Sequence, residues 1–204
     1  MMTADQKAAW LSERAGKLTA SRMATAMSFL KNGEPSKARQ QLLFDLLAER
    51  VTPFNVDHFV TPAMQWGIDH EDEAVDFFAA RYQRTPRPSR FYEHPALQNF
   101  GATPDRELDD GLLEIKCPTT AKFLAWSLGG VVPEEHKPQL AAQLLCTGKS
   151  WVGFIAYDPR VKEESKRLFM RKYEPTQEEL SGVFGHASAF LDELDDMFDR
   201  FVSK

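Results

Sequence analysis

The chain has 204 residues, 43% of them hydrophobic and 27% charged, with a formal net charge of −5. Its length and apolar content predict a single domain, residues 1–204, that folds around its own core. The negative charge argues against binding nucleic acid through bulk positive potential, and the lack of a long hydrophobic run or a signal peptide predicts a cytoplasmic protein with no membrane partner.

The first half of the chain is predicted to be largely helical. Hydrophobic side chains at helical spacing predict helices over residues 4–13, 19–30, 36–50 and 64–84. The second of these begins after Gly16, with Thr19 or Ser21 as its cap, because either hydroxyl can accept a hydrogen bond from a free amide. The segment 52–62 contains two prolines and is expected to be a connector.

The second half is predicted to alternate strands with helices. Strands are expected over residues 90–93, 97–103, 111–117, 151–157 and 166–173. Helices are expected over residues 120–128, 134–146 and 177–201. The first three strands should be neighbours in one sheet. This order of elements predicts an α/β fold with helices on the faces of the sheet.

Two carboxylates and an ammonium group are expected to meet at the end of this sheet. Asp105 follows a proline at a strand end, and Glu114 and Lys116 share one face of the next strand because side chains alternate with period two. Hard oxygen ligands suit Mg²⁺ or Mn²⁺, and a nearby lysine can orient a water molecule and help to deprotonate it. The alternative is a hairpin with a solvated acidic turn and an incidental Glu-x-Lys pair.

Residue types that often bind transition metals are isolated in this chain. Cys117 and Cys146 form no CxxC pair, so neither a zinc site nor an iron–sulfur cluster is indicated, and both are expected to be reduced and buried. His70 and His136 are lone histidines, which are more often structural than functional.

Basic side chains concentrate in two zones that could line the path of a polyanion or could simply be solvated surface charge. They are Arg81, Arg84, Arg87 and Arg90 in the first zone, and Lys137, Lys149, Arg160, Lys162, Lys166 and Arg167 in the second.

Taken together, six ordered blocks resemble the phage lambda exonuclease and YqaJ-type alkaline exonuclease family, a branch of the PD-(D/E)xK nucleases. The blocks are residues 13–21, Trp66-Gly67 with Glu71, residues 102–105, residues 113–118, Gln139 with Gln143, and residues 157–160. The resemblance covers most of the chain. It implies a restriction-endonuclease-like core, in which a central mixed β-sheet is flanked by helices.

The resemblance also implies an activity and a set of partners. It implies a Mg²⁺-dependent enzyme, with two ions and with Mn²⁺ as a possible substitute, that degrades the 5′-ended strand of duplex DNA in the 5′ to 3′ direction. It further implies 5′-phosphorylated DNA ends as substrate, a homotrimeric ring, a single-strand annealing recombinase as partner, and a phage or prophage origin in a bacterial host. An apolar stripe on the last helix is expected to be available for burial in the trimer: Phe190, Leu191, Leu194, Met197 and Phe201.

By motif match, the metal ligands are Asp105, Glu114, the carbonyl of Ile115, and Glu71. Lys116 is expected to position the attacking water, and Gln139 to orient the lysine or the water. Glu71 could instead be a surface glutamate of its helix, and Gln139 could be a buried amide that satisfies a loop.

A second group of residues matches the family's DNA-binding positions. Arg14, Ser21 and Thr103 match a pocket for the terminal 5′ phosphate, a cradle of one guanidinium and two hydroxyls that is chemically sound. Arg14 could instead pair with Glu13 or another acid. Met64 stands where the family has an apolar wedge that separates the end base pairs, and Lys31 lies near the loop that reaches the minor groove.

One residue departs from the family pattern. Arg106 follows Asp105 where a small residue or glycine is common. It could contact a phosphate near the scissile bond, or it could pair with Glu107 or Asp109. The competing functional readings are another PD-(D/E)xK nuclease, such as a structure-specific endonuclease or a RecB-like domain, and a catalytically idle DNA-binding module.

Overall fold

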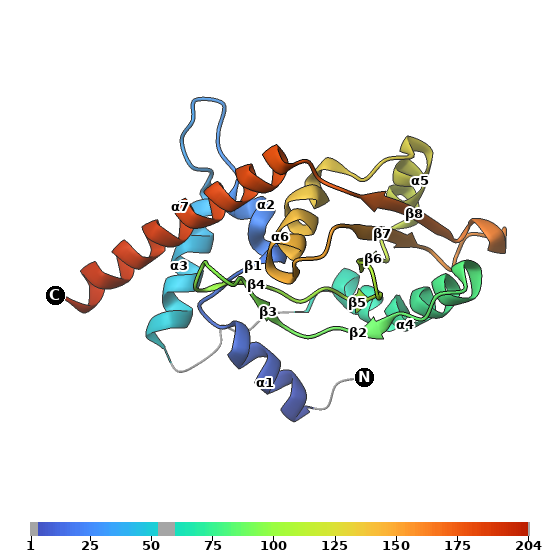
Figure 1. Ribbon diagram of the computed structural model, residues 1–204, viewed down its shortest axis with the longest axis horizontal. Helices are drawn as coiled ribbons and strands as arrows, with labels where there is room; N and C mark the ends of the chain where they lie inside the picture. Colours follow the sequence, from blue (N-terminus) through green and yellow to red (C-terminus); the bar gives the residue numbers. More distant parts are fainter. Residues whose placement is uncertain (1–3, 53–59, 204) are drawn as a thin grey trace.

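The computed structural model of the protein describes residues 4–52 and 60–203, which form a mixed α/β fold (Figure 1). Its helices are α1 Ala4–Arg14, α2 Met23–Ala26, α3 Lys37–Val51, α4 Pro62–Tyr82, α5 Thr120–Gly129, α6 Lys137–Thr147 and α7 Gln177–Val202. Its strands are β1 Leu18–Thr19, β2 Arg87–Pro88, β3 Tyr92–Glu93, β4 Phe100–Ala102, β5 Arg106–Glu107, β6 Leu112–Lys116, β7 Val152–Tyr157 and β8 Leu168–Tyr173. Short 3₁₀ turns lie at Ala20–Arg22, Glu134–His136 and Glu164–Lys166.

The strands form two sheets, and the larger one is mixed. Its order is β2-β5-β6-β7-β8, with β6 and β7 parallel and the other neighbours antiparallel. The smaller sheet has the order β1-β4-β3, with β1 parallel and β3 antiparallel to β4. The expected fold class, a mixed sheet flanked by helices, is therefore confirmed.

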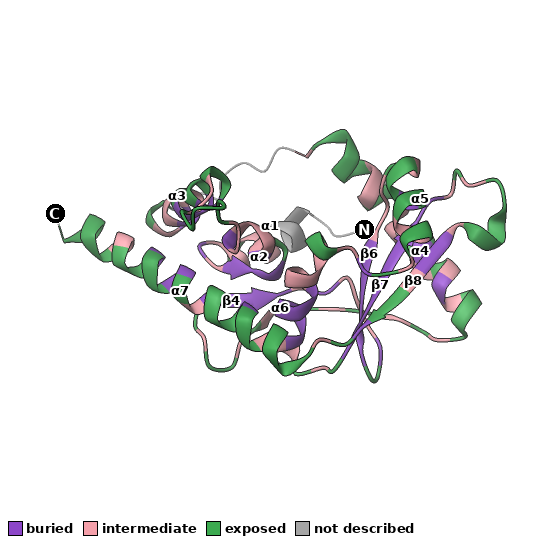
Figure 2. Cartoon of the chain, turned by 90° about the horizontal axis from the view of Figure 1, so that it is seen from above, coloured by how far each residue is buried: buried purple, intermediate pink, exposed green. Residues whose placement is uncertain are grey.

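The two faces of β6 and β7 pack against different helices. Leu113, Ile115 and Ile155 form one apolar cluster with Ala74 and Phe78 of α4. The alternate side chains of the same strands join a larger cluster with α5, α6 and α7, which includes Leu112, Val152, Phe154, Phe123, Leu140 and Phe190. Burial on both faces makes β6 and β7 the interior of the molecule (Figure 2). Glu114 and Lys116 consequently point towards α6, because they share the face of Leu112.

The prediction of a helix over residues 19–30 is wrong. Leu18 instead donates its amide to the carbonyl of Asn99 (2.8 Å), and Leu18 and Thr19 become a strand parallel to β4. The chain then makes a 3₁₀ turn and the single helical turn α2 before it reaches an isolated bridge between Phe29 and Pro35. Pairing with a strand about eighty residues away thus outweighs local helical propensity.

The prediction that the first three strands are neighbours in one sheet is also partly wrong. The strands β3 and β4 pair with each other in the smaller sheet, whereas β6 lies in the larger sheet between β5 and β7. The two-residue strand β5, which the sequence analysis did not identify, forms antiparallel pairs with β6. Asp105 stands directly before β5, so the turn between the two sheets carries this carboxylate.

The last helix starts where it was expected. Thr176 accepts a hydrogen bond from the amide of Glu179 (3.2 Å), and the Glu179 carboxylate accepts one from the amide of Thr176 (2.7 Å), a complete capping box. Much of the apolar stripe of α7 is buried in its own chain rather than left free for a trimer contact, since Phe190, Leu191 and Leu194 belong to the main core. The carboxyl-terminal end of α7 projects from the body (Figure 1), and its Phe201 is exposed.

Other helix ends follow the sequence directly. Ser36, Thr61 and Thr119 cap α3, α4 and α5 with their hydroxyl groups, and Gly130 and Gly148 end α5 and α6 in left-handed conformations with φ of 68° and 70°. No helix among the described residues is long and apolar enough to cross a membrane.

Candidate active site

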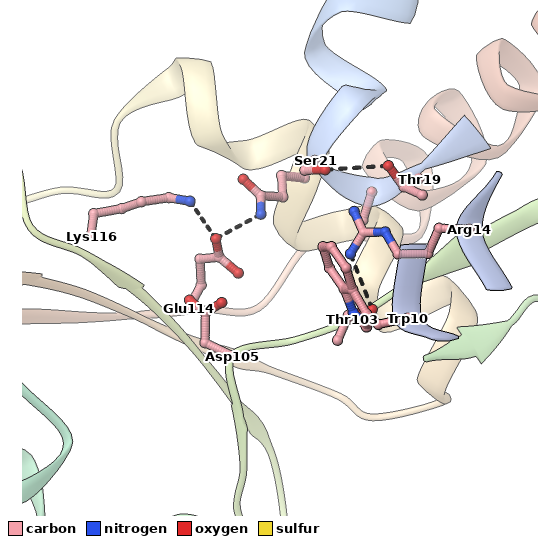
Figure 3. A pocket seen from close by; sticks show the side chains of 10 residues that line it. Trp10, Arg14, Thr19, Ser21, Thr103, Asp105, Glu114 and Lys116 are labelled. Atoms are coloured by element: carbon pink, nitrogen blue, oxygen red, sulfur yellow. Dashed lines mark hydrogen bonds and ion pairs between the residues drawn. The ribbon is translucent and has the colours of Figure 1, made fainter. Parts of the chain in front are cut away.

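Asp105, Glu114 and Lys116 meet at one pocket, as the strand pattern predicts (Figure 3). The Oδ2 atom of Asp105 accepts a hydrogen bond from the amide of Ile115 (2.6 Å), which ties the turn before β5 to the centre of β6. Lys116 lies two residues beyond Glu114 on the same face, and its Nζ atom donates to Oε1 of Glu114. The reading as a solvated hairpin does not hold, because Glu114 is 1% exposed.

Two glutamines of α6 hold the buried Glu114 carboxylate. Gln139 donates from Nε2 to Oε1 of Glu114 (2.6 Å), and Gln143 donates from Nε2 to Oε2 (2.5 Å). Residues four apart lie on one face of a helix, so both amides reach the same carboxylate. Gln139 therefore contacts Glu114 and does not serve a loop. The sequence gives Gln143 no role of its own, and in the structure it binds the second oxygen of Glu114.

The charges of this site are unbalanced. Burial, and next the neighbouring Glu114 carboxylate, raise the pKa of Asp105 well above its usual range. Burial alone would lower the pKa of Lys116, but Glu114 and Asp105 outweigh it, so its pKa is raised and the ammonium stays charged. One ammonium facing the buried Glu114 and the partly buried Asp105 leaves a surplus of negative charge when both carboxylates are ionised, the condition in which a further cation is stabilised.

The donor set fits a divalent metal in part. Asp105, Glu114 and the Ile115 carbonyl are hard oxygen donors of the kind that Mg²⁺ and Mn²⁺ prefer. Glu71, on α4, is instead paired with Arg106, whose Nη1 atom lies 2.6 Å from Oε1 of Glu71. Within the described chain no three His, Cys, Asp or Glu side chains are grouped to hold a metal. The role of Glu71 as a metal ligand stays a prediction.

The same pocket extends to the residues expected to bind a 5′ phosphate. It has a volume of about 230 Å³, and its lining joins both groups: Trp10, Arg14, Thr19, Ala20, Ser21, Thr103, Asp105, Glu114, Lys116 and Gln139. Arg14 donates from Nη1 to Oγ1 of Thr103 (3.3 Å), and the hydroxyls of Ser21 and Thr19 lie 3.2 Å apart. The structure therefore brings Arg14, Ser21 and Thr103 together.

Arg14 is arranged to receive an anion. Burial, and next the nearby Arg22, lower the pKa of Arg14 to about 10, so its charge is poorly compensated although still present at neutral pH. Among the described residues it has no ion pair, contrary to the alternative in which it pairs with an acid. Its guanidinium lies over the Trp10 ring, 4.0 Å from the centroid. Trp10 was missed by the sequence analysis, although its place four residues before Arg14 on the same helix was a usable signal.

Two other predicted DNA-binding residues lie outside this pocket. Met64 is exposed in the first turn of α4. Lys31 is exposed in the loop between α2 and α3, which projects at the top of Figure 1. Neither lines the pocket, so their roles stay predictions.

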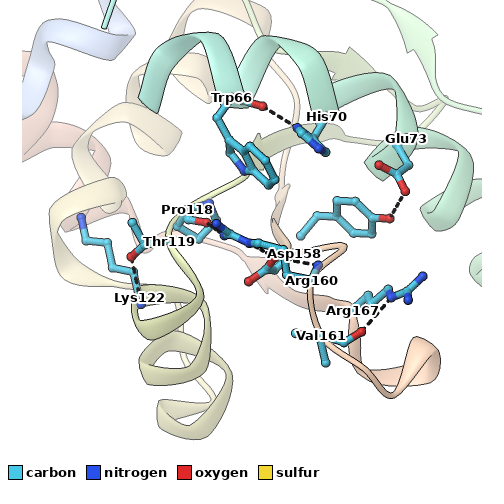
Figure 4. A network of polar contacts seen from close by, with 11 residues as sticks. Trp66, His70, Glu73, Pro118, Thr119, Lys122, Asp158, Arg160, Val161 and Arg167 are labelled. Carbon is cyan, nitrogen blue, oxygen red and sulfur yellow. Dashed lines mark hydrogen bonds and ion pairs between the residues drawn. The ribbon is translucent and has the colours of Figure 1, made fainter. Parts of the chain in front are cut away.

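A polar network links α4 to the segment that follows β6 (Figure 4). Arg160 donates from Nε to Oδ1 of the buried Asp158 (2.7 Å) and from Nη2 to the carbonyl of Pro118 (2.8 Å). Its guanidinium also lies over the Trp66 ring, 4.4 Å from the centroid. Two of the six blocks in the sequence, Trp66-Gly67 and residues 157–160, thus meet beside the strand that carries Lys116.

The lone histidines lie in aromatic packing. The rings of His70 and Trp66 stack with centroids 3.7 Å apart. His136 packs against Phe154, and burial followed by the charge of Lys116 lowers its pKa to about 4. His136 is therefore neutral at physiological pH.

Most of the basic side chains singled out in the sequence contact their own chain. Arg84 and Arg87 pair with Asp110 and Asp109, and Arg81 donates to backbone carbonyls of Ser165 and Leu168. These contacts favour the interpretation as surface charge over a continuous polyanion path. The free thiol of Cys146 is buried and that of Cys117 is partly buried, and burial raises the pKa of both to about 12.

Comparison with known proteins agrees with this geometry. A model of the YqaJ-like viral recombinase domain matches residues 9–150. The chain belongs to the YqaJ-like viral recombinase family. The matched segment contains the whole pocket lining, from Trp10 to Gln139. No curated protein sequence matches the chain.

Solved structures of exonucleases share the fold. The chain is similar to an alkaline exonuclease, LHK-Exo, from Laribacter hongkongensis, with a TM-score of 0.88, 29% identity and 96% of each chain covered. The structure of LHK-Exo in complex with dAMP is similar at a TM-score of 0.87, 29% identity and 95% coverage of each chain. A phage related exonuclease from Haemophilus somnus 129PT has a TM-score of 0.70 at 10% identity, covering 91% of this chain and 96% of that one, which shows the fold alone. Family and fold together support a nuclease.

Proposed function

We propose that this protein is a metal-dependent exonuclease that degrades the 5′-ended strand of linear double-stranded DNA from its 5′ end. It would release mononucleotides and leave a 3′ single-stranded tail for recombination by strand annealing. The observation that carries the proposal is the single pocket that joins the anion-binding Arg14 to Asp105, Glu114 and Lys116. A phosphate held at one end of a pocket this small fixes which phosphodiester bond can reach the other end.

Each side chain has a task in this scheme. Asp105, Glu114 and the Ile115 carbonyl are the residues that would hold Mg²⁺ or Mn²⁺. When bound, such an ion would supply positive charge to a phosphoryl group during its displacement by water. Lys116, charged because two carboxylates surround it, orients the water and stabilises negative charge that develops on the phosphoryl oxygens. Gln139 and Gln143 keep Glu114 in place, so its carboxylate does not have to reorganise during the reaction.

The anion end of the pocket supports this direction. Arg14 and the hydroxyls of Ser21 and Thr103 offer charge-assisted hydrogen bonds to a terminal phosphate, such as that of a phosphorylated 5′ end. The complex of LHK-Exo with dAMP supports a mononucleotide product for this family fold. Met64 and Lys31 would act outside the pocket, in end separation and in the minor groove.

The remaining assignments rest on the family. We propose a homotrimer that encloses DNA, a single-strand annealing recombinase as partner, and action in the cytoplasm of a bacterial host with a phage or prophage origin. A ring would let a chain with a net charge of −5 retain DNA by topology rather than by bulk attraction. Light scattering at working concentration tests the trimer, and a monomer would contradict it.

Substitution of the pocket residues tests the activity itself. Glu114→Gln and Lys116→Ala should abolish release of nucleotides from linear duplex while leaving duplex binding intact, because both side chains act at the scissile bond and glutamine keeps the size of the buried Glu114 side chain. Lys172→Ala is the matched control, since Lys172 is an exposed lysine paired with Glu174 elsewhere. Wild-type digestion by either pocket variant would refute the site. Loss of activity with cleavage of closed circles by the wild type would favour an endonuclease, and binding without any metal-dependent cleavage would favour an idle module.

A further inference from the structure

We propose that Arg106 is a built-in counter-ion of Glu71, so that the protein holds one divalent ion firmly at Asp105 and Glu114 and admits a second at Glu71 only by displacing this guanidinium. The inference rests on the proposed function, because it concerns the metal that the nuclease would use. It assigns a role to the one residue of the catalytic block that departs from the family pattern.

The contacts of Arg106 place its guanidinium between α4 and the catalytic turn. Its Nη1 atom donates to Oε1 of Glu71 (2.6 Å) and to the backbone carbonyl of Asp105 (2.7 Å), and its Nη2 atom donates to Oδ1 of Asp72 (2.7 Å). These partners are neither of the two acids expected from the sequence, Glu107 and Asp109. The planar guanidinium of Arg106 therefore has three oxygen acceptors, and these directional hydrogen bonds fix its position.

Burial shows which of these contacts matters most. The Arg106 side chain is 17% exposed and that of Glu71 is 31% exposed, whereas Asp72 is 82% exposed. A pair that solvent reaches freely contributes little, so Asp72 adds only weakly to the hold on Arg106. The pair of Arg106 with Glu71 is the one that a second metal ion would have to break.

The charge count around the pocket leads to the same conclusion. With all four carboxylates ionised, as metal binding requires of its ligands, Glu71, Asp72, Asp105 and Glu114 supply four negative charges, and Arg106 and Lys116 supply two positive ones. Two negative charges remain, which one divalent ion neutralises. With a small neutral residue in place of Arg106, a third negative charge would remain at Glu71, and the site would favour a second ion.

Arg106 could alternatively be a structural clamp between α4 and β5. A clamp and a counter-ion predict different results, because removal of a clamp lowers stability without changing how metal ions bind. Arg106→Gln removes the charge and keeps some hydrogen bonding, while Arg106→Lys keeps the charge and loses the fork that spans Glu71 and Asp72. Arg87→Gln is the matched control, since Arg87 is an exposed arginine paired with Asp109.

Isothermal titration of the DNA-free protein with Mn²⁺ and with Mg²⁺ tests the proposal without any assay of activity. Wild type, Arg106→Lys and Arg87→Gln should bind one ion firmly and a second weakly. In Arg106→Gln the weak site should tighten on the order of tenfold to a hundredfold, which corresponds to about 1.4 to 2.7 kcal/mol. Adding Glu71→Gln to Arg106→Gln should remove that gain. Circular dichroism confirms that each variant is folded, and Arg106→Met, which also removes the charge, should show the same tightening if Arg106→Gln does not fold.

Two outcomes would overturn the inference, and they are distinguishable. Equal metal affinities in wild type and Arg106→Gln, with only a lower melting temperature for the variant, would make Arg106 a clamp and leave the nuclease proposal standing. Absence of any metal binding in the wild type would instead remove the metal-dependent function on which the inference rests.

Discussion

Replacement of Arg14 with alanine is predicted to remove most of the preference for 5′-phosphorylated DNA ends. The guanidinium of Arg14 lines the pocket, donates to Thr103 and has no carboxylate partner among the described residues. Its loss therefore leaves no buried acid without a counter-charge, and the fold should tolerate the change. What is lost is the contact with the terminal phosphate, which sets the register of the scissile bond.

The size of the effect follows from the type of contact. A hydrogen bond to a charged group contributes about 1.5 to 3 kcal/mol, which corresponds to roughly tenfold to a hundredfold in rate. Burial, and next the nearby Arg22, lower the pKa of Arg14 to about 10. A bound phosphate would relieve this electrostatic cost, which favours the upper part of the range. Ends with a 5′ hydroxyl never make the contact and should be digested by the variant and the wild type at similar rates.

The assay compares digestion of one linear duplex prepared with 5′-phosphate or 5′-hydroxyl ends. Wild type and Arg87→Ala, which removes an exposed arginine far from the pocket, should both prefer the phosphorylated ends. Arg14→Ala should lose that preference through slower digestion of phosphorylated ends alone. Equal slowing on both substrates would refute the reasoning, since Arg14 would then support folding or general DNA binding.

Three further changes should alter stability. Asp105→Asn should raise the free energy of unfolding of the metal-free protein at neutral pH, because the Asp105 pKa is raised on folding and its ionised form destabilises the fold. Gln143→Leu should cost about 1 to 3 kcal/mol, because Glu114 loses a buried donor. Gly101→Ala should cost about 1 to 3 kcal/mol, because the added Cβ atom would lie 2.2 Å from the ring of Phe91.

Urea denaturation in the presence of a chelator measures all three changes. The gain from Asp105→Asn should vanish at acid pH below the ordinary carboxyl pKa of about 3.9, where Asp105 is protonated in both states, and a gain independent of pH would contradict the electrostatic cause. Gln41→Leu removes an exposed glutamine that contacts Asp45, and it should change stability by less than about 0.5 kcal/mol. Gly182→Ala adds a Cβ atom with no neighbour within 4 Å in α7, and it should stabilise by about 0.5 to 1 kcal/mol. A loss of less than about 0.5 kcal/mol for Gly101→Ala would contradict the importance of packing at Gly101, and the same result for Gln143→Leu would contradict the importance of its hydrogen bond.

Local sequence patterns were sufficient to predict which side chains of β6 share a face. The alternation along residues 111–117 correctly put Glu114 and Lys116 on one face and Leu113 and Ile115 on the other, because β6 is buried on both sides and has no freedom to slip. Helical spacing likewise predicted the limits of α5 and α7 to within two residues, with Gly129 and Gly130 marking the end of α5.

Contacts between distant segments could not be predicted in this way. The strand at Leu18 exists because β4 pairs with it, and nothing in residues 18–30 encodes that partner. The sequence left Arg106 to contact a phosphate or to pair with Glu107 or Asp109. It reaches Glu71 instead, because α4 packs against the face of β6 that carries Leu113 and Ile115. Such pairs depend on how elements pack, which a single sequence expresses only through resemblance to a family.

The most direct test is digestion of a linear duplex in which one strand carries a labelled phosphate at its 5′ end or a label at its 3′ end, with and without Mg²⁺. The account predicts that the 5′ label is released at once as a mononucleotide, that the 3′ label is released last, and that neither is released without the metal ion or by Glu114→Gln. Early release of the 3′ label, or release of either label in the absence of divalent metal, would contradict the claim that this pocket cleaves DNA from the 5′ end.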